Sequence, residues 1–505
     1  MARRSRKRTA QASSGKHWHY PAQLRHPFQP QDYLDASAID DIHQTALQVL
    51  EELGIKVLLP EAVDIFAKAG ALIDEDMVHI GRDMVEAALA TAPASFPLNA
   101  PNPDRSLLVE PGQMIFSPGA GCPNATDKIR GRRPGDLQSY SDALRLQQSF
   151  DVIHLMGPSA EPQDVPAHLR HFAFMNAQLG LTDKPLFVYA RGQAQVEQSF
   201  EMIQIALGLS DDAFRATPWT KTVINTNSPR QLDRPMSQGI IDFARYGQIL
   251  VITPFCLAGA MAPITIAGAL VLQHAEALAG IVLAQLVNPG APCVYGAFGS
   301  NVDMKSGAPA FGTPEHMQMT LGSGQLARHI GLPWRSGAGT AANLADAQAA
   351  GETHMSLWAA LLANATMTFH AAGWLEGGLT FGYEKFINDI EALQSFAHMI
   401  RKPDTSRDAL GFDAIAEVQP GGHFFATAQT MDRYDSAFYV PVLAELANFG
   451  TWTEAGAQNA EDRATKVWQD ILANFQPPPG STERAGRIQD YIACQTERGG
   501  APIMD

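Results

Sequence analysis

The chain has 505 residues, and its 52 acidic and 37 basic side chains give a formal net charge of −15 at pH 7. Apolar residues make up 46% of the chain and charged residues 18%, which is typical of a globular protein and excludes a disordered one. The acidic balance argues against nucleic acid as the main partner, because binding to phosphates needs a basic face. The length fits several domain-sized units or one large barrel with additions.

Residues 1–30 are expected to form a basic, disordered tail. Five basic side chains stand between residues 3 and 8, and Pro21, Pro27 and Pro30 close the segment. No apolar stretch follows the basic run, so we predict no secretory signal. An arm that binds nucleic acid or a membrane is the alternative interpretation.

Residues 31–110 are predicted to form a helical N-terminal layer. Its first helix carries an apolar stripe, has Asp35 or Ser37 as its cap, and ends at Gly54. Two shorter helices are expected at 60–68 and 83–92.

From residue 111 onwards, short β-rich runs alternate with stretches long enough for a helix. This rhythm indicates parallel βα units, and eight of them predict an α/β fold, a TIM (β/α)8 barrel over 111–400. An open doubly wound sheet is the alternative. Residues 401–505 are expected to form a largely helical C-terminal extension, helical over 430–475. The expected strands are 114–117, 152–156, 186–189, 222–225, 249–253, 292–295, 333–335 and 367–370.

Two further features bear on the compartment. The stretch 257–287 is the most apolar in the chain, but Pro263 and Glu276 interrupt it, so we expect a buried Ala-rich helix region and no membrane span. No two cysteines form a CxxC pair, which predicts neither a zinc site nor a disulfide framework and favours a cytoplasmic protein. The cysteines are Cys122, Cys256, Cys293 and Cys494.

A barrel would place the functional site at the C-terminal ends of its strands. Aromatic side chains gather at the expected ends, and aromatic faces hold cations such as quaternary ammonium groups. Ordinary core packing is the alternative for each of them. Trp374 is the strongest candidate, because Gly373, Gly377 and Gly378 leave room around it. The candidate aromatic substrate-binding residues are Tyr189, Tyr295, Phe298, Trp334, Phe369, Trp374 and Phe381.

The candidate catalytic residues are His354, His370 and Glu376. Either histidine suits general acid–base chemistry or donation to a carboxylate, and a purely structural histidine is the alternative. His168 and His171 stand three residues apart but have no third ligand nearby in sequence, so we expect a solvated helix face and no bound metal.

Several segments together resemble a known family. They are the run 346–352 (DAQAAGE), then Gly373, Glu376, Glu384 and Asp389, with Asp127, Gly131, Arg133 and Asp136 earlier and Asp462-Arg463-Ala464 later. In order and spacing, over roughly residues 30–480, the chain resembles the trimethylamine–corrinoid methyltransferase (MttB) superfamily.

The resemblance implies a TIM barrel that moves a methyl group from an amine to the Co(I) corrinoid (cobalamin) of a partner protein, in one-carbon metabolism of the methanogenesis type. The trimethylamine enzymes carry pyrrolysine in the barrel, whereas this sequence has only standard residues. The chain is therefore similar to the non-pyrrolysine branch, which is glycine betaine methyltransferase-like and acts on quaternary amines. Ala350 departs from the family pattern, which has Gly there.

Physical chemistry also favours a quaternary amine, whose nitrogen leaves as a neutral amine without proton transfer or zinc. A carboxylate beside the cation would stabilise the ground state more than the transition state, whereas an aromatic cage carries less of that penalty. The carboxylate of a betaine would need donors, and Arg191, Arg335 and His354 are candidates. The two arginines are equally candidates for salt bridges at the barrel rim.

Two other functions stay open: a lyase-type barrel enzyme that uses His370 or Glu376 as acid or base, and a betaine-binding protein without turnover. We expect a corrinoid-binding protein to dock over the C-terminal face of the barrel. The low charged fraction and the surplus of apolar residues also suggest a homo-oligomer. The acidic balance and the interrupted apolar stretch 257–287 predict neither nucleic acid nor a membrane as partner.

Overall fold

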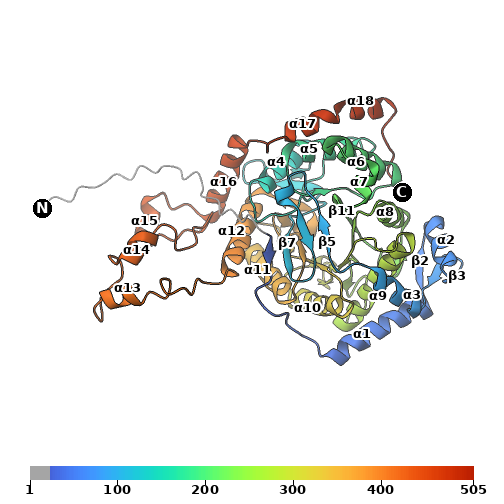
Figure 1. The fold of residues 1–505 in the computed structure, drawn as a ribbon, viewed down its shortest axis with the longest axis horizontal. Coiled ribbons are helices and arrows are strands. Elements are labelled where there is room, and N and C mark those ends of the chain that lie inside the picture. Colours follow the sequence, from blue (N-terminus) through green and yellow to red (C-terminus); the bar gives the residue numbers. More distant parts are fainter. Residues whose placement is uncertain (1–22, 505) are drawn as a thin grey trace.

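The computed structural model describes residues 23–504, so the expectation of a disordered tail lies mostly outside the described residues. The centre of the fold is a curled eight-stranded sheet with the order β1-β7-β19-β18-β15-β13-β11-β10 (Figure 1). All neighbours run parallel except β1, which pairs antiparallel with β7 at the edge. The strands are β1 (Leu24–Arg25), β7 (Gln113–Phe116), β10 (Leu186–Phe187), β11 (Thr220–Ile224), β13 (Ile249–Ile252), β15 (Cys293–Gly296), β18 (Trp334–Gly337) and β19 (Met367–Phe369).

Helices cover the outer face of this sheet, because each of its parallel strands is followed by a helix. The apolar α9 is long and apolar enough to cross a membrane by composition, but 78% of its most apolar window is buried inside the protein. It packs against α1, α3 and α8 and is therefore a core helix here. The covering helices are α4 (Leu137–Gln148), α5 (Arg170–Leu181), α6 (Gln193–Leu207), α8 (Arg234–Arg245), α9 (Ile266–Val287), α10 (Pro314–His329), α11 (Ala347–Leu362) and α12 (Tyr383–Met399).

Side chains alternate between the two faces of the sheet, as strand geometry requires. Outward residues such as Leu250 and Tyr295 join the core beneath the helices. Inward residues such as Val251 and Val294 form a separate inner core with the hairpin of β5 (Phe96–Leu98) and β6 (Leu107–Val109). The hairpin thus covers the end at which the strands begin, and the opposite end carries the loops that follow them.

The segment 152–156, expected as a strand, forms no ladder. It lies between β7 and the start of β10, where His154 N–H donates to the Phe116 carbonyl at 3.0 Å and Met156 N–H donates to the Pro185 carbonyl at 3.2 Å. The Phe116 N–H donates instead to Nδ1 of His154 at 3.0 Å. A side chain therefore takes the place of the backbone acceptor that a ladder would use.

The N-terminal layer is mixed, not purely helical as expected. Its helices form as predicted, and the Asp35 side chain caps the first by accepting from Ala38 N–H at 2.8 Å. Between them lie strands of three residues, too short for a visible alternation of apolar and polar residues. The layer comprises α1 (Ala36–Gln48), a π-helical turn (Val49–Leu53), β2 (Ile55–Val57), α2 (Pro60–Lys68), β3 (Leu72–Asp74), β4 (Met77–His79) and α3 (Arg82–Thr91), with β12 (Gln231–Leu232) added to the sheet of β2.

Two small sheets lie beyond the C-terminal ends of the central strands. One joins β20 and β21, which follow β19, to β8 and β9, which follow β7. The other joins β14, which follows β13, to β16 and β17, which follow β15. Their bounds are β8 (Asn124–Thr126), β9 (Arg133–Pro134), β14 (Leu257–Ala258), β16 (Ser300–Val302), β17 (Pro309–Ala310), β20 (Trp374–Leu375) and β21 (Thr380–Gly382).

The C-terminal extension has two parts. Residues 401–458, which we call the arm, project from the rounded body in Figure 1 as a long excursion between α12 and α16. The expected helix over 430–475 is only partly present, because the chain is not helical around Pro441 and leaves the helix again at Gly456, whose φ is positive. The helices of the extension are α13 (Phe412–Glu417), α14 (Ala428–Arg433), α15 (Phe449–Glu454), α16 (Ala460–Asn474), α17 (Ser481–Arg487) and α18 (Gln489–Glu497).

Candidate functional site

The centre of the candidate site is a contact between Arg335 on β18 and His370, which follows β19. Arg335 is 2% exposed, and its Nη2 lies 2.6 Å from Nε2 of His370. A guanidinium only donates, so Nε2 of His370 accepts and the imidazole is neutral with its proton on Nδ1. Burial, together with the charges of Arg335 and Lys221, lowers the pKa of His370 well below its usual value. His370 is therefore a neutral donor at physiological pH.

Arg335 has no acidic partner among the residues that the structure describes. Burial lowers its pKa to about 9, so it stays charged near neutral pH. Across residues 23–504, no ion pair forms at Arg335, and its Nε and the Nδ1 of His370 are buried without a hydrogen-bond partner. A buried, charged and unpaired guanidinium is costly unless an anion compensates it. The arrangement is therefore suited to an anionic group supplied by a ligand.

Aromatic rings stand against this cationic pair. The His370 ring stacks on Trp374 with centroids 4.0 Å apart, and Phe298 lies 5.3 Å from Trp374 and 4.9 Å from His370. Phe311 stacks on Phe298 at 4.7 Å and lies 5.2 Å from Trp374. These faces are the surfaces that hold a quaternary ammonium group.

Two glycines near the end of β18 admit these rings. A Cβ atom at Gly339 would lie 1.8 Å from the Trp374 ring, and one at Gly337 would lie 2.3 Å from the Phe298 ring. Any larger residue at either position would displace the aromatic side chain. The glycines of this strand end are thus needed for close approach.

A second buried cation lies within the same curled sheet. Lys221 on β11 is 1% exposed, and its Nζ lies 4.6 Å from the ring centroids of both Phe187 and Phe369. The Arg335 guanidinium also lies over the Phe369 ring, at 5.0 Å. Burial, followed by the charge of Arg335, lowers the pKa of Lys221 to about 7. The site interior is therefore strongly electropositive.

Two acidic side chains hold the loops around Trp374. Glu352 on α11 accepts from the N–H groups of Ala341 and Ala342 at 2.9 and 3.1 Å and from the Thr340 hydroxyl, which fixes the loop after Gly339. Asp389 on α12 accepts from the N–H of Gly373 at 2.8 Å and pairs with Lys385. Both carboxylates therefore act on Trp374 through the backbone and not by direct contact.

The structure brings together Phe298, Phe369, His370 and Trp374 of the residues predicted from sequence. Tyr295 and Trp334 point outward, where Tyr295 contacts His274 at 3.0 Å and Trp334 donates to the Asn364 carbonyl at 3.0 Å. Both residues stand at strand positions whose side chains point to the outer face of the sheet. They pack beneath the helices and do not line the site.

The remaining predicted residues lie outside the cluster around Arg335. His354 is exposed on α11, its ring 6.2 Å from Phe396. Phe381 packs on Tyr383 and Phe386. Glu376 pairs with Arg132 through both carboxylate oxygens.

Tyr189 and Arg191 form a separate group at the end of β10. The Arg191 guanidinium lies 4.1 Å from the Tyr189 ring and 2.6 Å from the Glu161 carboxylate, which also pairs with Arg170. Arg191 thus already has a carboxylate partner. This is the salt bridge that the sequence offers as the alternative to substrate binding.

His168 and His171 differ in their surroundings from the single solvated helix face that the sequence predicts. His171 is buried and contacts the Gln198 amide at 2.6 Å, which differs from the solvated face expected of it. Within residues 23–504, no three side chains of His, Cys, Asp or Glu are grouped as metal ligands.

Sequence reasoning missed Phe311 and Lys221. Lys221 lies one residue before the expected strand 222–225, and a lysine on the inward face of an apolar strand is a detectable signal. Phe311 follows the irregular β16–β17 hairpin, whose position no periodicity reveals.

Comparison with known proteins agrees with this architecture. The sequence profile described as trimethylamine methyltransferase (MTTB) matches residues 1–500. The chain is 35% identical over 462 residues to the glycine betaine methyltransferase of Desulfitobacterium hafniense, covering 91% of this chain and 96% of that protein. It is 28% identical over 457 residues to the trimethylamine methyltransferase MttB of the same species, covering 89% and 91%.

A solved structure shares the fold. The crystal structure of the monomethylamine methyltransferase MtmB of Methanosarcina barkeri superposes with a TM-score of 0.53 at 9% identity, covering 94% of this chain and 89% of that chain. At this identity the likeness concerns the fold alone. The family assignment rests on the sequence match over nearly the whole chain: the protein is a methyltransferase and belongs to the trimethylamine methyltransferase (MTTB) family.

Proposed function

We propose that the protein transfers a methyl group from glycine betaine, or a closely related carboxylated quaternary amine, to the Co(I) corrinoid of a partner protein. The single observation that carries this proposal is the buried Arg335 guanidinium, unpaired within residues 23–504 and adjacent to aromatic faces. Glycine betaine offers a carboxylate for the guanidinium and a trimethylammonium group for the rings. Trimethylamine offers no anion, so it would leave Arg335 uncompensated.

The comparisons support the same choice of substrate. The relative at 35% identity is a glycine betaine methyltransferase, and the trimethylamine enzyme of the same species is less similar. Their substrates belong to those proteins. For this chain, the buried guanidinium of Arg335 and the aromatic faces beside it support the same substrate.

The transfer balances without a proton. The corrinoid Co(I), a substrate carried by the partner, supplies the electron pair of the new bond, and the amine nitrogen keeps the pair of the bond that breaks. The product is the neutral tertiary amine, N,N-dimethylglycine when glycine betaine is the donor. In this proposal Trp374, Phe298 and Phe311 hold the cation, and Arg335 and His370 hold the carboxylate and orient the methyl group.

Acid–base chemistry of the lyase type gains no support from the site. His370 accepts from Arg335 and its pKa is held low, so it is a weak base. Glu376 is engaged by Arg132.

We also propose that the curled sheet closes into a (β/α)8 barrel. Its seven parallel strands would be completed by residues 152–156, which take the place of the eighth parallel strand between β7 and β10. Their hydrogen bonds to Phe116 and Pro185 support this closure.

The buried free cysteines Cys122, Cys256 and Cys293 support a cytoplasmic location, where thiols stay reduced.

The test is a methyl-transfer assay with Co(I) cobalamin or a Co(I) corrinoid protein as acceptor. Glycine betaine should be consumed and dimethylglycine should form in equal amount, with the cobalt absorption changing in step. The Arg335→Met variant should lose this activity and the Trp219→Ala variant should keep it. If neither glycine betaine nor another carboxylated quaternary amine is consumed, the proposal is wrong.

A further inference from the structure

The arm, residues 401–458, is the part of the chain that the body covers least. Among its residues only Ala414, Thr427 and Leu443 are buried. Figure 1 shows that α13, α14 and α15 extend away from the helices around the sheet. The arm therefore contributes almost nothing to the core of its own chain.

The arm nevertheless has a defined shape. At its root, Glu391 of α12 accepts from the Tyr439 hydroxyl at 2.8 Å and from Leu443 N–H at 2.6 Å. Near its tip, Gln429 donates to the Asp408 carbonyl at 2.8 Å, and Arg433 pairs with the Asp408 carboxylate. These bonds tie the α14 segment to the chain before α13.

The energetics of such an arm are unfavourable for a single chain in water. Each of its three helices has six residues, well below the length at which a helix is stable alone. Eleven large apolar side chains of the arm are exposed by 46% or more. They are Leu410, Phe412, Ile415, Phe424, Phe425, Met431, Tyr434, Phe438, Val440, Leu446 and Phe449.

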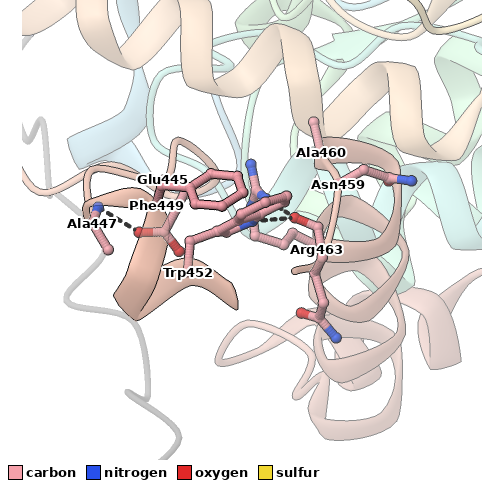
Figure 2. A pocket seen from close by; sticks show the side chains of 8 residues that line it. Glu445, Ala447, Phe449, Trp452, Asn459, Ala460 and Arg463 are labelled. Carbon is pink, nitrogen blue, oxygen red and sulfur yellow. Dashed lines mark hydrogen bonds between the residues drawn. The ribbon is translucent and has the colours of Figure 1, made fainter. Parts of the chain in front are cut away.

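A hollow of about 420 Å³ opens where the arm rejoins the body (Figure 2). Phe449 and Trp452 form one wall, with ring centroids 5.5 Å apart. Arg463 of α16 forms another wall and donates to the Gln458 carbonyl at 2.6 Å, which also accepts from the Trp452 indole at 3.0 Å. The hollow is large enough for an aromatic side chain, and the exposed aromatic residues of the arm are of that kind.

We propose that the arm is a self-association surface, which packs against the arm of a second copy of this chain. Each large apolar side chain exposes on the order of 100 Å², so the eleven together offer about 1,000 Å² per chain. Two copies would then bury about 2,000 Å², which lies in the range of permanent homodimers. This pairing supplies the core that the arm lacks.

The apolar character of the arm selects a second copy over the corrinoid carrier. A carrier protein must leave after each methyl transfer, and interfaces of transient partners are only as apolar as ordinary protein surface. Permanent interfaces resemble a protein core cut in half. An arm with six exposed aromatic residues matches the permanent kind.

The test measures the mass of the full-length protein in solution by light scattering and sedimentation over a hundredfold concentration range. The wild type should be a dimer or a larger closed assembly at micromolar concentration. The double variant Phe425→Ser/Phe438→Ser should shift to the mass of one chain, with a dissociation constant raised at least a hundredfold. These two side chains are 79% and 80% exposed, so their replacement leaves the fold of the body intact.

A matched control carries Leu72→Ser/Ile264→Ser, two apolar residues that are each 69% exposed outside the arm. It should assemble as the wild type does. Circular dichroism verifies that all variants are folded, and hydrogen exchange should show arm amides protected in the wild type and unprotected in the arm variant.

Three results would each overturn the proposal. The first is a wild-type protein that is monomeric on its own. A wild type that associates only after corrinoid protein is added, or only after residues 1–22 are removed, counts as this result. The second is an arm variant that assembles like the wild type. The third is an equal loss of assembly in the control.

Discussion

Arg335 Nη2 and His370 Nε2 lie 2.6 Å apart, and this contact fixes the chemical state of both residues. Because the guanidinium can only donate, the histidine must be neutral, and its remaining proton sits on Nδ1. The two side chains together present donors, and no acidic side chain within residues 23–504 pairs with them. A site built in this way is incomplete until an anion arrives.

Removal of the charge at Arg335 should therefore change binding and stability in opposite directions. Arg335→Met should weaken glycine betaine binding roughly 10- to 150-fold, the value of a charge-assisted hydrogen bond of about 1.5–3 kcal/mol. The same variant should unfold at a higher temperature, because it no longer buries an unpaired charge. Titration calorimetry and thermal unfolding measure the two effects.

Arg25→Met is the control for this pair of effects. Arg25 is exposed and pairs with Glu110 at the surface, so neither quantity should move appreciably. If Arg335→Met bound glycine betaine with unchanged affinity, the guanidinium would not contact the substrate.

The aromatic wall should bind the cation through Trp374 above all. Trp374→Ala should weaken glycine betaine binding about tenfold or more, since a desolvated cation–π contact is worth about 2 kcal/mol. Trp374→Phe should keep most of the affinity. Trp219→Ala, at the opposite end of β11, should bind as the wild type does, and equal losses at Trp219 and Trp374 would show that the cation lies elsewhere.

Glu352 should act as a positioning residue. Glu352→Ala frees the N–H groups of Ala341 and Ala342 and lets the loop beneath Trp374 shift, so the KM for glycine betaine should rise about tenfold with a smaller change in kcat. Glu352→Gln keeps an oxygen acceptor and should restore KM to within about threefold.

Glu86→Ala provides the comparison for Glu352, because Glu86 is an exposed helical glutamate of α3 far from the site. A kcat loss without a KM change in Glu352→Ala, or failure of glutamine to rescue it, would contradict the positioning role.

Lys221 should make glycine betaine binding depend on pH. Its pKa of about 7 means that the ammonium form grows as the pH falls from 8 to 6, while Arg335 stays charged and His370 stays neutral. The betaine carboxylate remains ionised in this range, so the added positive charge should tighten binding at pH 6 relative to pH 8. Calorimetry at three pH values measures the trend.

The Lys221→Met variant should abolish this trend, because it has no group that titrates there. Binding of glycine betaine should also take up protons near pH 7 in the wild type, which appears as a dependence of the measured heat on the buffer. Tighter binding at pH 8 than at pH 6 would contradict the assignment.

The order of strands and helices could be predicted from sequence because each βα unit carries its own apolar run and its own helix. The segment 152–156 shows the limit of that reasoning. It has the composition of a strand, but His154 supplies a side-chain acceptor to Phe116, and only the three-dimensional contact reveals this.

The site was predicted in part for a similar reason. Phe298, His370 and Trp374 stand just past strand ends, where barrel geometry places ligand contacts. Tyr295 and Trp334 were also expected there, but strand alternation turns both outward, and one residue of register decides the face. Phe311 could not be predicted, because it reaches the site from an irregular hairpin.

The most direct test of this account compares two ligands that share one cation. Glycine betaine and choline carry the same trimethylammonium group, but only glycine betaine has a carboxylate. Glycine betaine should bind saturably to the wild-type protein in titration calorimetry, with choline at least tenfold weaker and the difference lost in Arg335→Met. Equal binding of the two ligands to the wild type would contradict it, because Arg335 would then have no part in recognising the substrate.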